Sequence, residues 1–107
     1  MSSDHAPAAP HPGEVLAERL AGCGLSVYRI SAIMHIPYVR LHQVVKGDRR
    51  LTPDTALRLE RALGVPAEYW LGLQASHDLA LAREAAGASL ELIEPVDGSS
   101  GDVRAAE

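Results

Sequence analysis

Histidine and cysteine are the residues of this chain best suited to metal binding or catalysis, and their spacing argues against both roles. The histidines, at positions 5, 11, 35, 42 and 77, show no metal-ligand spacing, and the single cysteine has no CxxC partner. The chain also lacks a glycine-rich phosphate loop and a GxSxG motif. The sequence therefore favours neither an enzyme nor a protein with a metal or other cofactor.

A second kind of chemistry, hydrogen bonding to nucleic acid, fits the stretch from Tyr38 to Lys46. Leu41, Val44 and Val45 recur at i, i+3 and i+4 and predict one buried face of a helix. The other face would then present a polar and basic set without acidic residues, namely Tyr38, Val39, Arg40, His42, Gln43 and Lys46. Such a face is suited to reading a DNA groove. The alternative is an ordinary helical hairpin of an all-α protein.

The elements before and after this face predict how it is positioned. Ser26 is a good N-cap for a preceding helix, whose apolar stripe is Ile30, Ile33 and Met34. Pro37 must end that helix near His35. Gly47 can end the second helix. Two helices joined by so short a turn must cross steeply, as in a helix-turn-helix.

Three more helices are predicted around this pair. One begins at Pro12 and ends at Gly22 or Gly24, and another is capped by Thr52 and ends at Gly64. A long helix is expected from Pro66 to Gly87. Alternating residues over 89–95 favour a short strand after it. We therefore predict a flexible arm over 1–11, a helix-turn-helix domain for DNA binding and dimerisation over 12–87, and a short strand with a disordered acidic tail over 88–107.

Composition and charge are compatible with that division. The 107 residues are enough for one modest core, and no apolar run approaches the length of a membrane span. The net charge is −4, but the charges are unevenly distributed. Residues 26–62 include seven basic and three acidic residues, whereas residues 63–107 include two basic and eight acidic residues. A basic centre suits contact with phosphate. The lone Cys23, expected to be buried at a helix end, fits a reducing cytoplasm.

Several stretches together resemble a known family. HPGEVL, the helix-turn-helix ending in VVKGDRRLT, and PDTALRLERALGVPAEYWLGLQASHDL are similar to the HigA-type antitoxins, a branch of the lambda-repressor-like (XRE) DNA-binding proteins. The resemblance implies a five-helix, all-α fold. In it His35 stands where the family usually has the turn glycine, and so it must adopt a left-handed conformation or shift the turn. The resemblance further implies a homodimeric repressor of its own operon that binds double-stranded DNA at an inverted-repeat operator and neutralises a HigB-type, mRNA-cleaving toxin.

The resemblance also implies site residues, because the second helix of such a pair enters the major groove. Bases would be read by Tyr38, Val39, Arg40, His42 and Gln43, with Gln43 suited to adenine and Arg40 to guanine. Phosphates would be bound by Tyr28, Lys46, Arg49 and Arg50. Dimerisation would use apolar and aromatic residues of the C-terminal part, namely Tyr69, Trp70, Leu73, His77, Leu81 and Leu92.

Two other functions remain open from the sequence. One is a stand-alone XRE-family transcriptional regulator without a toxin partner, because nothing in the residues themselves indicates the toxin. The other is a protein-interaction module that has lost DNA binding. A mobility shift on operator DNA would separate a DNA-binding protein from an interaction module, and an adjacent toxin gene would separate an antitoxin from a stand-alone regulator.

Overall fold

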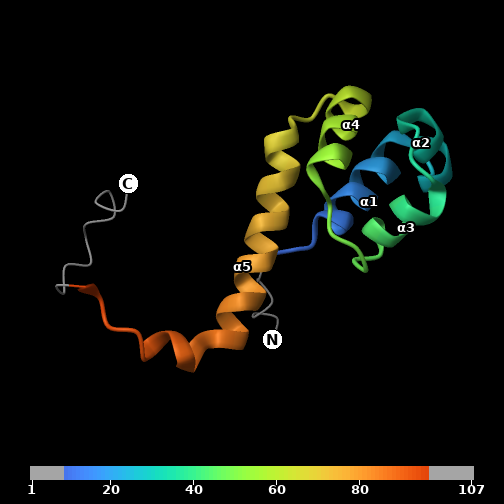
Figure 1. Ribbon diagram of the computed structural model, residues 1–107. Coiled ribbons are helices and arrows are strands. Elements are labelled where there is room, and N and C mark those ends of the chain that lie inside the picture. The colour runs from blue at the N-terminus through green and yellow to red at the C-terminus, as the bar shows by residue number, and fades with distance from the viewer. Residues whose placement is uncertain (1–8, 97–107) are drawn as a thin grey trace.

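A computed structural model describes residues 9–96, and within this range the chain forms five α-helices (Figure 1). They are α1 (Pro12–Cys23), α2 (Val27–Met34), α3 (Tyr38–Val45), α4 (Pro53–Leu63) and α5 (Ala67–Glu91). The predicted five-helix, all-α fold is confirmed. The predictions for most of the arm and for the end of the tail fall on residues 1–8 and 97–107, outside the described residues.

Local side chains and left-handed residues determine where the helices begin and end. The Ser26 hydroxyl accepts a hydrogen bond from the Arg29 amide at 3.0 Å, and Thr52 caps α4 in the same way through the Thr55 amide. Gly24 and Gly64 end α1 and α4 in the left-handed conformation. His35 ends α2 in the left-handed conformation, with φ 59° and ψ 44°, which is the first of the two alternatives that the resemblance left open.

The core gathers one or two residues from every helix. Its fully buried members include Leu16 of α1, Ile30 of α2, Leu41 of α3, Leu59 of α4 and Trp70 of α5. Burial of each such side chain contributes about 1.5–3 kcal/mol before the entropy cost of folding. Figure 1 shows α5 running beside α4 and then extending past the other helices. Its first half therefore belongs to the core, and its second half does not.

Two smaller expectations about burial are wrong. Ile33 is 47% exposed, although Ile30 and Met34 of the same predicted stripe are buried. α2 is only eight residues long and packs against the core mainly along one narrow side. Ile33 lies at the edge of that side and is therefore left exposed to solvent. Cys23 is exposed at the end of α1 rather than buried.

The expected end of the last helix and the expected strand are both wrong. α5 continues through Gly87 to Glu91, so the first three residues of the predicted strand are helical, and Leu92 to Pro95 form no strand. Alanine, leucine and glutamate around Gly87 favour a helix strongly enough to offset the cost of about 1 kcal/mol for one interior glycine. Within residues 9–96 no other strand exists to pair with this segment. The helix ends a few residues before Pro95.

The burial of Trp70 corrects its predicted place in a dimer surface. The side chain is completely buried in the protein's own core, and so it has no surface to offer a second chain. Its neighbour Tyr69 is 42% exposed and packs edge-to-face on it, with ring centroids 5.5 Å apart. The i, i+1 spacing of the two aromatics placed them on adjacent faces of α5, one inward and one outward.

His11 is a structural residue that sequence reasoning left in the arm. Its Nδ1 accepts a hydrogen bond from the Gly13 amide at 2.9 Å, which caps α1, and its ring meets His77 of α5 edge-on at 5.1 Å. Burial, and then the nearby His77, lower the pKa of His11 below its ordinary value of 6.5. The Arg49 backbone, Glu14 and Asp78 act in the opposite direction but do not reverse the shift.

Stability should consequently fall on acidification. Because the pKa of His11 is lower in the folded chain, its contribution to the free energy of unfolding is complete above pH 6.5 and is lost as the pH falls through the folded-state value. When Tm is measured at about pH 7.5 and at about pH 5, the decrease on acidification should be smaller for His11→Asn than for the wild type. Asparagine caps a helix without titrating in this range. His35→Asn is the control, since asparagine also accepts the left-handed conformation. An unchanged decrease in His11→Asn would contradict this assignment.

Candidate nucleic-acid interface

The corner between α2 and α3 determines which side of α3 faces solvent. Three residues, 35–37, join the helices, and the second of them, Ile36, is buried in the core. Leu41 and Val44 of α3 are also buried, which fixes the rotation of the helix about its axis. α3 is therefore held at its turn and along its inner side.

The outer side of α3 brings together four of the five predicted base-reading residues. Tyr38 and Val39 are 40% and 63% exposed, and His42 and Gln43 are half-buried one turn later. Arg40 is set apart. Its guanidinium lies toward α4, with Nη2 3.9 Å from the Asp54 carboxylate, at the limit of an ion pair.

Aromatic rings cover the N-terminal end of this face. Tyr38 stacks on His42 with centroids 5.3 Å apart, and its hydroxyl lies 3.3 Å from the His42 Nδ1. Tyr28, which is 70% exposed at the start of α2, lies next to it, with its ring 6.0 Å from that of Tyr38. The predicted phosphate contact on α2 and the predicted reading face on α3 thus form one continuous surface.

The loop between α3 and α4 adds basic residues beside this surface. Lys46, Arg49 and Arg50 are all exposed, but their side chains have different surroundings. The Arg49 Nε donates to the Gln43 Oε1 at 2.9 Å. Arg50 forms an ion pair with Asp78 of α5, and this guanidinium lowers the pKa of the Asp78 carboxyl. The structure therefore directs Arg49 toward α3 and Arg50 toward α5.

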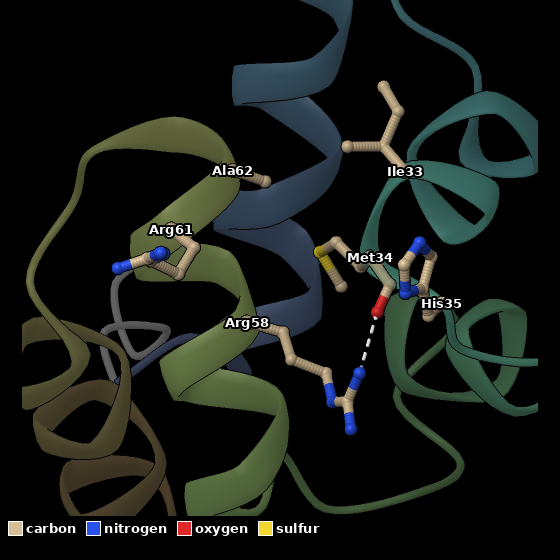
Figure 2. Close-up of a pocket in the computed structure, with 6 residues that line it drawn as sticks. All are labelled: Ile33, Met34, His35, Arg58, Arg61 and Ala62. Carbon is tan, nitrogen blue, oxygen red and sulfur yellow. Dashed lines mark hydrogen bonds between the residues drawn. The ribbon is translucent and has the colours of Figure 1, made fainter.

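Arg58 of α4 stabilises the corner between α2 and α3. Its Nη1 donates to the Met34 carbonyl oxygen at 2.9 Å, and its Nε to Asp54 at 3.0 Å. Figure 2 shows this side chain reaching from α4 to the end of α2, in a hollow of about 350 Å³ that Ile33, Arg61 and Ala62 also line. The carbonyl at the C-terminus of α2 is one that the helix itself leaves unpaired. In the sequence, the i, i+4 spacing of Asp54 and Arg58 was the only sign that Arg58 would form such contacts.

Gln74 is the second residue that sequence reasoning missed. It is buried on the inner side of α5, and its Oε1 accepts a hydrogen bond from the Leu51 amide at 2.7 Å. Its Nε2 donates to Asp78 at 3.0 Å. A buried polar side chain needs such partners, so a glutamine on an apolar face was the available sign.

Comparison with known proteins agrees with this geometry. A helix-turn-helix family model (HTH_3) matches residues 16–70, from α1 to the buried tryptophan of α5. The chain belongs to the XRE-type helix-turn-helix family. The match spans the corner, the outer side of α3 and the loop after it, and ends within the first turns of α5. In this helix-turn-helix protein, the second half of α5 lies outside the shared region.

Similar proteins within this helix-turn-helix family include antitoxins. Virulence-associated protein I of Dichelobacter nodosus is 40% identical over 75 residues, which are 69% of each chain. The structure of a HigA-family addiction module antidote protein from Coxiella burnetii has a TM-score of 0.78 and 36% identity, covering 81% of this chain and 97% of that one. The Pseudomonas aeruginosa antitoxin HigA, solved with the higBA promoter, has the same TM-score and coverage with 31% identity. The expected resemblance to HigA is confirmed.

Neither a metal-ligand cluster nor a membrane-spanning helix is found among residues 9–96. Within that range no group of three or more histidine, cysteine or acidic side chains is placed to hold a metal ion. No helix in the same range is both long and apolar enough to cross a lipid bilayer. The outer side of α3 with its flanking loop is the surface on which a functional proposal can be built.

Proposed function

We propose that this helix-turn-helix protein is a sequence-specific DNA-binding repressor and the antitoxin of a HigBA-type toxin–antitoxin system. The observation that favours this most is a fixed α3 whose exposed side presents hydrogen-bonding and apolar groups beside a basic loop. Similarity to an antitoxin solved with promoter DNA supports the same function. In this proposal the protein represses its own operon and neutralises a HigB-type, mRNA-cleaving toxin by forming a complex with it.

DNA recognition would follow from the side chains of α3. With α3 in the major groove, Tyr38 and Val39 are suited to apolar contact with a thymine methyl group, and Gln43 to the paired donor and acceptor of adenine. His42 lies one turn behind Tyr38 and would follow it into the groove. Arg40, at the side of the helix, would have to leave Asp54 to reach a guanine.

Phosphate contacts would fix the orientation of α3 on the duplex. Tyr28 and Lys46 flank α3 at opposite ends, and Arg49 adds a guanidinium between α3 and the loop. Arg50 is the weakest of the predicted phosphate contacts, because it must give up its ion pair with Asp78 to reach DNA. We propose that Arg50 mainly holds the loop against α5.

A homodimer would place two such surfaces on one side of the DNA, about 34 Å apart, and so would require an inverted repeat. The exposed apolar residues of the second half of α5 and of the two residues that follow it support this proposal. Leu81 and Leu92 of the predicted dimer surface are 54% and 82% exposed, as are Leu79, Leu90 and Ile93 to similar degrees. Apolar side chains exposed in such number along and just beyond one projecting helix favour contact with another chain. Tyr69, Leu73 and His77 would lie at the inner edge of that contact.

A mobility shift with the DNA upstream of the chain's own coding sequence tests the proposed binding. We expect a complex that resists competition by random duplex. Its affinity should fall roughly a hundredfold between about 50 and about 200 mM salt, as expected when two cationic side chains from each protomer displace counterions. Equal competition by specific and random duplex would contradict sequence-specific recognition.

The toxin requires a separate experiment. The chain should be co-expressed with the product of a short neighbouring gene, and a stable complex that suppresses mRNA cleavage is expected. A shift on the upstream DNA without any such complex would instead support a stand-alone regulator.

A further inference from the structure

The hydrogen bond between Arg49 and Gln43 joins the loop after α3 to the side chain best suited to read adenine. The Arg49 Nε donates to the Gln43 Oε1 at 2.9 Å, across six residues of sequence. A glutamine amide presents an oxygen on one side and an NH₂ group on the other. The guanidinium accepts no hydrogen bond, so it favours the amide orientation with the oxygen toward Arg49.

This orientation matters because adenine recognition uses both ends of the amide. The oxygen must accept from the adenine N6 while the NH₂ group donates to N7. The Gln43 oxygen has two lone pairs, so it can accept from Arg49 and from adenine together. A rotated amide would place NH₂ against the guanidinium, donor against donor. Arg49 thus selects the amide orientation before DNA arrives and lowers the entropy cost of ordering Gln43 in the groove.

The loop that presents Arg49 is itself held from several sides. The Leu51 amide donates to the buried Gln74 of α5 at 2.7 Å, and the neighbouring Arg50 pairs with Asp78. At the other end of the loop, the Asp48 amide donates to the Gln43 carbonyl oxygen at 2.8 Å. The backbone on both sides of Arg49 is therefore fixed relative to α3 and α5.

We propose that Arg49 is a specificity-determining residue that positions Gln43, in addition to any phosphate it binds. This proposal rests on the proposed DNA-binding function. It differs from a purely electrostatic role in one respect. A phosphate contact affects all sequences alike, whereas a residue that orients Gln43 affects mainly sequences with the matching base.

A double-mutant cycle separates the two roles. The full-length wild type, Gln43→Ala, Arg49→Ala and the double variant are titrated against the upstream duplex protected by the wild type and against a random duplex of equal length. Arg49→Ala should lower the ratio of specific to random affinity about threefold to tenfold for each half-site in the wild-type background, the effect of one hydrogen bond of ordinary net strength. In the Gln43→Ala background it should leave that ratio unchanged while still lowering both affinities.

Two further variants sharpen the result. Lys46→Ala removes a charge from the same surface and should lower both affinities by equal factors. Arg49→Lys keeps the charge without the planar fork, so it should preserve random binding and lose part of the ratio. The proposal would be overturned if Arg49→Ala lowered the affinities for both duplexes by the same factor. It would also be overturned if this substitution lowered the ratio of specific to random affinity equally in the wild-type and Gln43→Ala backgrounds. A wild type that does not distinguish the two duplexes would instead refute the proposed function itself.

Discussion

Replacing Trp70 with alanine should lower the free energy of unfolding by about 3–5 kcal/mol, the usual cost of truncating a fully buried aromatic side chain. The indole is completely buried and packs where α5 meets the rest of the core. Its Nε1 has no hydrogen-bond partner within the described residues. Trp70→Phe therefore loses volume without losing a hydrogen bond, and it should cost less than half as much as Trp70→Ala.

Urea unfolding at several protein concentrations checks this prediction. Tyr69→Ala is the matched control, because it removes the neighbouring but partly exposed ring of the same aromatic pair. Tyr69→Ala should lower the free energy of unfolding by no more than about 1–2 kcal/mol. If Trp70→Ala instead left the stability of the monomer intact and changed only the association of chains, the tryptophan would belong to a dimer surface and not to the core.

Replacing Gly13 with alanine should cost about 1–3 kcal/mol or more, since a methyl group there meets backbone that cannot rotate away. The added Cβ would overlap the Val44 carbonyl oxygen and lie 2.8 Å from that of Val45. The first turn of α1 therefore lies directly against the C-terminal end of α3. To relieve the overlap α3 must shift, so affinity for operator DNA should decrease together with stability.

Gly22→Ala is the control for this substitution, in the same helix. A Cβ at Gly22 meets nothing within 4 Å, so alanine should raise stability by about 0.5–1 kcal/mol and leave DNA binding unchanged. Thermal melts and mobility shifts of the two variants, side by side, provide the comparison. A Gly13→Ala protein as stable as Gly22→Ala would show that α1 and α3 are not in this close contact.

The corner was predictable from the sequence because it depends on local chemistry. Ser26 and Pro37 act on backbone within a few residues of themselves, so their spacing alone located the turn between α2 and α3. Helix periodicity then placed Leu41 and Val44 inward, and the exposed side of α3 followed from it.

Contacts between distant residues were not predictable in this way. Arg58 and Gln74 pair with backbone 24 and 23 residues away, and no spacing rule connects such positions. The inward rotation of Trp70 depended on how α5 packs against α4, which the aromatic pair alone does not specify. The strand expected over residues 89–95 failed for a related reason, because alternation over a few residues does not distinguish a strand from the end of a long helix.

The outer side of α3 is the surface that we propose meets DNA. Backbone amide shifts of the ¹⁵N-labelled protein, recorded while the upstream duplex is added, test this proposal most directly. We expect the largest changes at Tyr28, over residues 38–43 and over the loop 46–50, with small changes along α4 and the second half of α5. Large changes confined to α4 and α5, with α3 unaffected, would contradict DNA binding by the outer side of α3.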